Sequence, residues 1–168
     1  MWLNQGVDDF VAEWRHEGQI ITFSWVGDVP VFLRRVYTLA FTRAGEMLLV
    51  GDETGAFWLP GGGIEGVETP GEALARELLE EAAATVEASS YLGAQRVEDP
   101  LHEPEYHGFH WCRIQLADDY APVFEVTKRL LIPPEEFLDT LFWGRSDPKA
   151  AMLLEKALEE NRRYEGEI

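Results

Sequence analysis

The chain has 168 residues, of which 46% are hydrophobic and 27% charged, and its formal net charge is −17 at pH 7. This length and apolar content are sufficient for a proper core, so we expect a single domain over residues 1–168. So negative a surface repels phosphate backbones, which argues against a nucleic-acid duplex as partner. No apolar run approaches the ~20 residues that span a bilayer, so no membrane partner is expected.

The N-terminal segment and the cysteine content bear on location. Residues 1–18 include Asp8, Asp9 and Glu13 and contain no apolar core of a secretory signal. The single cysteine, Cys112, allows no internal disulfide and is expected to be a small core residue. Both features are consistent with a reducing compartment, and we expect a cytoplasmic location.

The first third of the chain is rich in β-branched and aromatic residues, which favour strands. Short polar or glycine-containing segments at 43–46 and 52–55 predict turns. We therefore expect strands over residues 20–26, 31–42, 47–50 and 56–59.

A helix is predicted next. Thr69 suits the N-cap, Pro70 the first turn, and Glu72 would complete a capping box with Thr69. Good helix formers continue to Val86, so the helix is expected to reach that residue. Its predicted apolar face consists of Leu74, Ala75, Leu78, Leu79, Ala82 and Val86.

The second half of the chain returns to strand patterns and ends in helices. Pro133 and Pro134 begin a short helix through Leu141, and Asp147 with Pro148 caps a final helix. Strands are predicted over residues 91–97, 108–116 and 123–132. Strands, a helix, more strands and then helices indicate the α+β class or a mixed layer architecture.

Three glutamates share one stripe of the first helix. Glu77, Glu80 and Glu81 lie three or four residues apart, and no lysine or arginine follows any of them one turn later. Only Arg76 could offset Glu80, unless it reaches back to Glu68. Carboxylates one turn apart suit Mg²⁺, which prefers oxygen ligands, although a solvated acidic face would have the same pattern. From the residues alone, both interpretations stay open.

The glycine-rich segment before the helix has two interpretations. Gly61, Gly63 and Gly66 fit the G-x-G-x-x-G pattern of dinucleotide sites, a weak match when it stands alone. Pro60 precedes the pattern, the helix begins only after Thr69, and no βαβ unit surrounds it. These features argue against a dinucleotide fold. There is also no G-x-x-x-x-G-K-[ST] loop of a P-loop NTPase.

Loop and helix together resemble the signature of the Nudix hydrolase family, whose glycine, glutamate and Arg-Glu-apolar-x-Glu-Glu run have fixed spacings. The matching residues are Gly62, Glu68, Arg76, Glu77, Leu78, Glu80, Glu81 and Ala84. Residues 58–63 are also similar to the usual lead-in of the family. Ala83 replaces the family glycine near the helix end. We therefore expect an altered exit turn and a slightly longer helix.

The resemblance implies an α/β/α sandwich around a mixed β-sheet, and it implies roles for the matched residues. By this resemblance Glu77, Glu80 and Glu81 would bind Mg²⁺ or Mn²⁺. The catalytic candidates are Glu77, Glu81 and, outside the signature, Glu125. Many members of the family dimerise, so the resemblance is compatible with a homodimer.

The loop residues have structural roles by the same resemblance. Glu68 and Arg76 would pair and hold the loop against the helix. The main chain at Gly61, Gly62 and Gly63 would face metal and phosphate, where the absence of side chains permits close approach.

The resemblance implies hydrolysis of the pyrophosphate linkage in a nucleoside diphosphate derivative. Pro100 follows Ala84 by sixteen residues, a spacing similar to one in ADP-ribose hydrolases. A nucleoside triphosphate is the rival substrate. A Nudix-fold sensor that binds nucleotides without cleaving them is the alternative function, and an acidic scaffold for basic proteins would leave the motif unexplained.

Other residues have both a functional and a structural interpretation. The polar loop 98–105 could contact substrate or could be an exposed connector. His102, His107 and His110 lack the spacing of a zinc site, and strand alternation places His107 opposite His110. The aromatic residues Trp111, Phe142 and Trp143 could stack on a base or fill the core.

Overall fold

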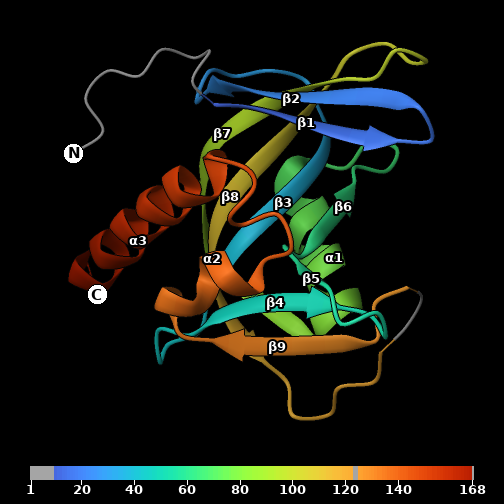
Figure 1. Ribbon diagram of the computed structural model, residues 1–168. Helices are drawn as coiled ribbons and strands as arrows, with labels where there is room; N and C mark the ends of the chain where they lie inside the picture. The colour runs from blue at the N-terminus through green and yellow to red at the C-terminus, as the bar shows by residue number, and fades with distance from the viewer. Residues whose placement is uncertain (1–9, 123–124, 168) are drawn as a thin grey trace.

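The structure, a computed structural model, describes residues 10–122 and 125–167. Its strands form one mixed sheet in the order β1-β2-β7-β8-β3-β4-β5, with β6 paired to β3 and β9 paired to β4 (Figure 1). The β3–β8 pair is parallel and the other pairs are antiparallel. The strands are β1 Val11–His16, β2 Gln19–Gly27, β3 Leu33–Phe41, β4 Met47–Gly51, β5 Phe57–Trp58, β6 Gly61–Gly63, β7 Ala84–Glu98, β8 Glu105–Leu116 and β9 Lys128–Ile132.

Helices cover both faces of this sheet. Helix α1 packs against β7, β6 and β3, whereas α3 packs against β8, β3 and β7 on the opposite face (Figure 1). The helices are α1 Pro70–Ala82, the 3₁₀ turn η2 Pro134–Glu136, α2 Phe137–Thr140 and α3 Lys149–Glu167. This arrangement confirms the predicted α+β class and the layered architecture. None of the described helices combines the length and apolarity that crossing a bilayer requires.

The central strand β3 contributes to two separate hydrophobic cores because its side chains alternate between faces. Val36 and Ala40 are buried with Leu78 of α1. Leu39 is buried with Leu153 of α3 on the other face. Each fully buried leucine contributes roughly 1.5–3 kcal/mol, so both helices are held mainly by apolar contact.

Helix α1 begins as predicted. The Thr69 hydroxyl accepts a hydrogen bond from the Glu72 N–H at 3.2 Å, and the Glu72 carboxylate accepts one from the Thr69 N–H at 3.0 Å. Pro70 occupies the first helical position, where its missing N–H costs nothing. This capping box fixes the start of the helix that carries the glutamates.

The end of α1 differs from the prediction. The helix stops at Ala82, and Ala83 adopts a left-handed conformation with φ 50° and ψ 42°. Extension to Val86 and lengthening by the alanines are therefore wrong, because Ala84 already begins β7, opposite Leu116 of β8. Sheet pairing overrides the helix propensity of these residues. Ala83 thus adopts the conformation that glycine usually provides at a helix end.

Other predicted boundaries also shift. Leu79 and Ala75 were expected on the apolar face of α1, but both are exposed. Strands β7 and β8 begin earlier than predicted, whereas β9 is shorter than the predicted strand over 123–132. Residues 123 and 124 of that prediction lie outside the described residues, and Glu125 lies in a turn. The strand β1 was not predicted from the sequence.

Candidate active site

The glycine-rich segment forms the short strand β6 alongside β3. Gly61 pairs with Tyr37, and Gly62 pairs with Val36. A Cβ on Gly61 would lie 2.0 Å from the Val36 carbonyl oxygen, and the φ of Gly61 is 148°. Only glycine fits this position, so β6 can lie close to both β3 and α1.

Glu81 meets the main chain of this strand. Its Oε2 accepts a hydrogen bond from the Gly61 N–H at 3.0 Å. Burial raises the pKa of the Glu81 carboxyl to about 8, and the negative charges of Glu77 and Glu80 add to this, whereas the bond from Gly61 opposes it. A buried carboxyl beside two others is poorly stabilised as an anion unless a cation approaches.

Glu77 meets the same strand one residue further on. A Cβ on Gly62 would lie 2.3 Å from the Oε1 of Glu77, so this carboxylate rests directly against the glycine. Glu77 and Glu81, one helical turn apart, therefore both face the main chain of β6. The structure thus brings Glu77 and Glu81 together with Gly61 and Gly62, four residues of the predicted site.

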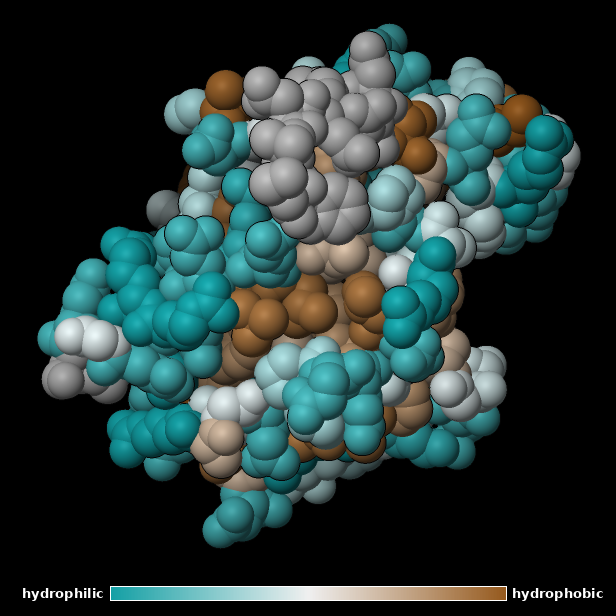
Figure 2. Space-filling model, turned by 60° about the vertical axis from the view of Figure 1, so that its left-hand side comes forward, coloured by the Kyte–Doolittle hydropathy of each residue, from teal (hydrophilic) through white to brown (hydrophobic). Residues whose placement is uncertain are grey.

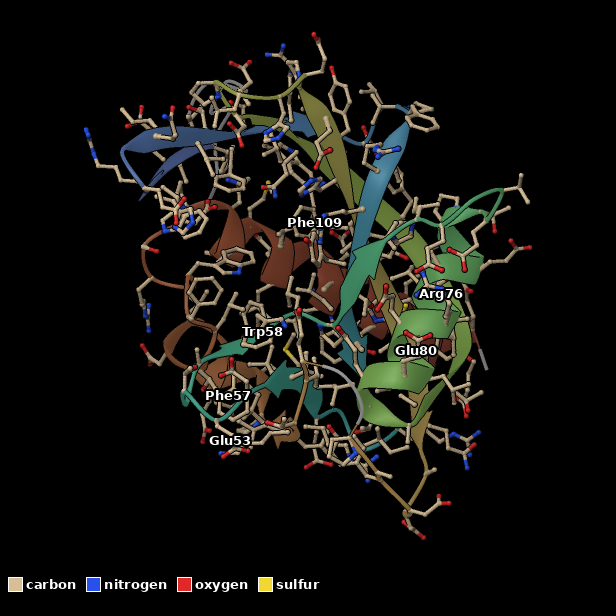
Figure 3. All side chains as sticks on the ribbon, turned by 90° about the vertical axis from the view of Figure 1, so that its right-hand side faces the viewer. Glu53, Phe57, Trp58, Arg76, Glu80 and Phe109 are labelled. Atoms are coloured by element: carbon tan, nitrogen blue, oxygen red, sulfur yellow. The ribbon has the colours of Figure 1, made fainter. Side chains whose placement is uncertain are left out.

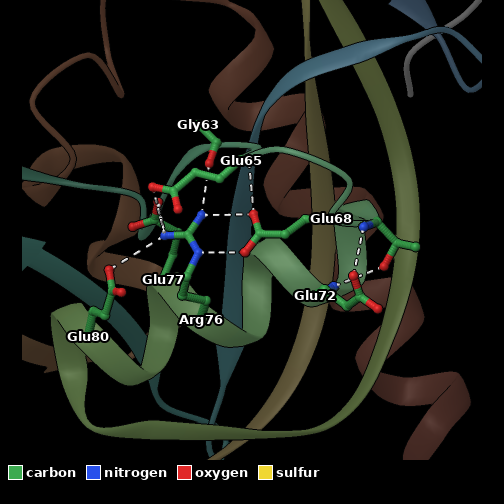
Figure 4. Close-up of polar contacts among 8 residues, drawn as sticks. Gly63, Glu65, Glu68, Glu72, Arg76, Glu77 and Glu80 are labelled. Carbon is green, nitrogen blue, oxygen red and sulfur yellow. Dashed lines mark hydrogen bonds and ion pairs between the residues drawn. The ribbon is translucent and has the colours of Figure 1, made fainter.

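Arg76 links the loop to the helix (Figure 4). Its Nε and Nη2 donate to the two carboxylate oxygens of Glu68 at 2.7 and 3.1 Å, and Nη2 also donates to the Gly63 carbonyl at 2.9 Å. Its Nη1 lies 3.0 Å from the Oε1 of Glu77 and 3.5 Å from the Oε2 of Glu80. The sequence left two alternatives for Arg76, and the structure shows both at once.

The third glutamate, Glu80, is the most open to solvent, with 39% of its side chain exposed. Within the described residues, no three His, Cys, Asp or Glu side chains are arranged as a metal-binding group. The donor chemistry of Glu77, Glu80 and Glu81 nevertheless fits a hard divalent cation, since all their ligating atoms are carboxylate oxygens. To bind one ion together, these carboxylates would have to turn toward a common point.

A cavity of about 390 Å³ lies on the α3 face of the sheet. An apolar area surrounded by polar residues is visible on this side of the molecule (Figure 2). The lining residues are Ala12, Glu13, Trp14, Phe23, Tyr37, Trp58, Leu59, Gln95, His107, Phe109, Phe142, Trp143, Ser146 and Asp147. Half of them are aromatic rings from distant parts of the chain, so the cavity suits a flat ligand.

The cavity adjoins the glutamate cluster. Tyr37 lines the cavity and is paired with Gly61, which donates to Glu81. Burial raises the pKa of Tyr37, and the charge of Glu81 adds to this. Arg76 and Glu80 lie on one side of β3 and β6, and Trp58 and Phe109 on the other (Figure 3). A ligand could therefore reach from the cavity to the glutamates past the edge formed by β6.

Comparison with known proteins then decides the family. The family model of the NUDIX domain matches residues 31–154. This chain belongs to the NUDIX family. Members of this family generally use divalent metals. No curated protein matches the chain.

Solved structures show the same Nudix fold. The Bacillus subtilis pyrophosphohydrolase BsRppH has a TM-score of 0.68 at 23% identity, covering 88% of this chain and 96% of its own. The MutT protein from Methanosarcina mazei Go1 has a TM-score of 0.54 at 22% identity, covering 76% and 93%. A NUDIX hydrolase from Nitrosomonas europaea has a TM-score of 0.58 at 16% identity, covering 75% and 88%. At these identities, the similarity is evidence for the fold alone.

The structure separates the three histidines. His107 lines the cavity, where its Nε2 lies 2.7 Å from the Oε1 of Glu105. His110 points to the opposite face, where its ring lies 5.3 Å from that of Tyr91. His102 is exposed. The predicted alternation along β8 is confirmed, and the described histidines do not form a shared metal site.

The aromatic candidates also separate. Phe142 and Trp143 line the cavity, as a base-stacking role requires. Trp111 is buried in the core instead, with its ring 5.2 Å from that of Tyr164. The predicted loop 98–105 contributes none of the described lining residues, so Pro100 lies outside the cavity wall.

The segment between β8 and β9 borders the glutamate cluster. Arg129 of β9 donates to the Ala82 carbonyl at 2.7 Å and to the Ala117 carbonyl at 2.8 Å, which ties β9 and Ala117 to the end of α1. The Arg129 guanidinium lies over the Tyr120 ring at 4.7 Å. Glu125 is exposed, and the described residues show no contact between it and the three glutamates. Its catalytic role stays a prediction.

Several lining residues were not predicted from the sequence. Trp14 comes from β1, Phe23 from β2 and Gln95 from β7. The sequence around each of them resembles that of any strand, so only the register of the sheet reveals that they line the same cavity. The one signal available was Trp58, which lies three residues before Gly61, the first of the three consecutive glycines.

Proposed function

We propose that this protein hydrolyses the pyrophosphate linkage of a nucleoside diphosphate derivative, with Mg²⁺ or Mn²⁺ held by Glu77, Glu80 and Glu81. The observation that carries the proposal is the contact of two of these carboxylates with the main chain of β6, beside an aromatic cavity. The Glu81 carboxylate accepts from the Gly61 N–H, and Glu77 rests against Gly62.

The electrostatics of the cluster support a bound cation. Arg76 supplies one positive charge to Glu68, Glu77 and Glu80, so the cluster keeps an excess of negative charge. The raised pKa of Glu81, about 8, reflects burial and these negative neighbours. A divalent ion would offset this repulsion and, when bound, supply Lewis-acid stabilisation of the charge that develops on phosphoryl oxygens.

The residues of the chain would bind and orient the diphosphate. Gly61 and Gly62 let the Val36 carbonyl and the Glu77 carboxylate lie against the strand, whereas Gly63 has open space where a side chain would lie, so phosphate oxygens could approach its main chain closely. The bidentate pair between Arg76 and Glu68 fixes this loop on α1, so the geometry is set before substrate binds. Such preorganisation is a main source of rate enhancement.

Proton transfer from the attacking water needs a carboxylate near neutral pKa. Glu81 and Glu77, one turn apart on the same face of α1, both lie against β6 and are the candidates within the signature. Glu125 remains a third candidate: Tyr120, five residues before it, contacts Arg129, whose guanidinium donates to the carbonyl of Ala82, the residue after Glu81. Substitution of each by glutamine would identify the base by its effect on kcat.

The cavity would receive the part of the substrate that does not react. Its volume of about 390 Å³ lies within the ordinary range for small-molecule sites. An ADP-ribose-like compound and a nucleoside triphosphate both join an aromatic base to a pyrophosphate, so either fits this arrangement. The similarity in fold to the Bacillus subtilis pyrophosphohydrolase agrees with hydrolysis of a pyrophosphate.

A substrate panel tests the proposal. Nucleoside diphosphate derivatives and nucleoside triphosphates are incubated with Mg²⁺ or Mn²⁺, and phosphorylated products are identified. We expect turnover of at least one compound, its loss in EDTA, and its loss in Glu81→Gln but not in Glu155→Gln, an exposed control on α3. Tight binding without turnover would instead select the alternative, a nucleotide sensor.

A further inference from the structure

We propose that Gln95 selects the end of the ligand that does not react. Its side-chain amide would pair with a neutral heteroaromatic ring that carries a hydrogen-bond donor next to an acceptor, as nucleobases do. The inference rests on the proposed function only for the role of the diphosphate. Recognition of the ring itself can be measured without any hydrolysis.

Gln95 is a largely buried residue whose side chain faces the cavity. Its residue exposure is 7%, and it lines the cavity from the middle of β7. The sheet register places it between Trp25 of β2 and His107 of β8. No hydrogen bond joins its side-chain amide to any described residue, and its polar atoms are not among the fully buried ones that lack a partner, so the amide is open to the cavity. An amide that faces a cavity without a protein partner is available to pair with a ligand.

The surroundings of Gln95 favour a flat ring. Tyr37 and Phe109 lie 5.9 Å apart between ring centroids on the same floor of the cavity. Trp14 and Trp143 add aromatic surface from β1 and from the segment after α2. Stacking on such rings is tolerant of ring type, so stacking alone does not choose between ligands. The polar group in the floor then becomes the discriminating contact.

The charges around the cavity favour a neutral ring. Burial lowers the pKa of His107, so its imidazole is neutral near pH 7 although Glu105 opposes this shift. Asp147 is already paired with the buried Lys149, at 2.7 Å. No lysine or arginine lines the cavity among the described residues, and its other carboxylate, Glu13, is exposed to solvent. Phosphates are therefore better placed toward Gly61, with the ring alone in the cavity.

A glutamine amide recognises a pattern of hydrogen bonds. Its carbonyl accepts and its NH₂ donates, which matches an adjacent donor and acceptor on a base edge. Removing one exocyclic group from the ligand leaves part of the buried amide unpaired again. Sites of this kind reject such analogues strongly, whereas apolar pockets discriminate weakly. We therefore expect Gln95 to account for most of the ring preference.

The test uses nucleoside binding in EDTA, followed by the fluorescence of Trp14, Trp58 and Trp143, which line the cavity. The probes are the four common nucleosides together with purine and pyrimidinone ribosides that lack exocyclic groups. We expect the wild type to bind its best nucleoside roughly 10–100-fold more tightly than the matched analogue.

Three variants sharpen the result. Gln95→Leu should abolish that preference while leaving analogue binding within about twofold. Gln95→Glu, which only accepts when ionised, should shift the preference toward guanosine, whose edge has adjacent donors. Gln115→Leu, an exposed control on β8, should behave as wild type. Near-UV circular dichroism of each variant verifies folding.

Two outcomes overturn the inference: no nucleoside binds the wild type, or Gln95→Leu retains the full preference. The hydrolysis panel separates this from the proposed function. If the wild type hydrolyses a substrate but Gln95→Leu keeps the full nucleoside preference, only the inference about Gln95 is overturned. Gln95-dependent nucleoside binding without any turnover removes the proposed hydrolysis and leaves the inference in place.

Discussion

The two faces of the sheet contrast in how their functional residues are assembled. On the α1 face, the glycines and glutamates that would handle phosphate all lie within residues 61–81. On the α3 face, the cavity draws on residues from Ala12 to Asp147. Binding and hydrolysing a phosphate requires accessible main chain close to charged side chains, and one loop followed by one helix provides both. Enclosing a ring needs several walls, which only the assembled sheet provides.

The faces also differ in how they treat polar groups. On the α1 face, Arg76 satisfies Glu68 and Glu77 through a network of bonds. On the α3 face, the Gln95 amide has no hydrogen-bond partner among the described residues and opens to the cavity. A network of bonds holds a loop in place, whereas an amide open to a cavity is available to a ligand. Substitutions that act on one face or on both separate the contribution of the α1 face from that of the α3 face.

The largest expected effect comes from Gly61, which contacts both faces through Tyr37 and Glu81. In Gly61→Ala, a Cβ would lie 2.0 Å from the Val36 carbonyl oxygen. We expect a loss of about 3 kcal/mol in the free energy of unfolding, together with weaker nucleoside binding and lower activity. Urea denaturation measures the first. Gly63→Ala is the control, since nothing lies within 4 Å of that position.

A pH effect should arise on the α1 face from His110. Burial lowers its pKa to about 4 from 6.5, so the unfolded chain binds the proton more tightly. Its contribution to stability is therefore complete above pH 6.5 and declines as the pH falls toward 4. Relative to His110→Gln, the wild type should lose about 2 kcal/mol between about pH 7.5 and about pH 5.

Urea midpoints of the two proteins at each pH give this difference. His102→Gln, at an exposed histidine, should show no comparable change. If the unfolding free energy of the wild type changed with pH in the same way as that of His110→Gln, the role assigned to the burial of His110 would be contradicted.

Gly62→Ala should affect only the phosphate side. The added Cβ would meet the Oε1 of Glu77, the end of a flexible side chain, at 2.3 Å. Glu77 can turn away, so unfolding free energy should change by less than about 1 kcal/mol. The displaced carboxylate should lower kcat about tenfold or more. Nucleoside binding in EDTA should be unchanged. If nucleoside affinity fell by a factor similar to the fall in kcat, the two faces would not act separately.

The smallest effect is expected at the end of α1. Ala83 has a left-handed conformation that disfavours any residue with a Cβ. Ala83→Gly removes this strain, partly offset by the greater freedom of glycine in the unfolded chain. We expect a gain of about 0.5–1 kcal/mol in unfolding free energy with unchanged activity. Thermal denaturation measures the gain, and a destabilised variant would show that Ala83 is not strained.

The same contrast explains what the sequence could predict. The cap at Thr69 and Glu72 and the pairing of Arg76 with Glu68 depend on residues close in the chain, and both were predicted. The end of α1 was missed because the pairing of Ala84 with the distant Leu116 overrides local propensity. Gln95 was missed for a similar reason, since its position beside His107 depends on strand register.

The central claim is that the glutamates of α1 bind a divalent cation for hydrolysis, and Mn²⁺ binding followed by electron paramagnetic resonance tests it most directly. Free Mn²⁺ is measured during titration of the wild type, Glu81→Gln and the control Glu155→Gln. We predict that the wild type and Glu155→Gln bind Mn²⁺ equally and that Glu81→Gln binds it at least about tenfold more weakly. Equal binding by all three proteins, or none by the wild type, would contradict the account.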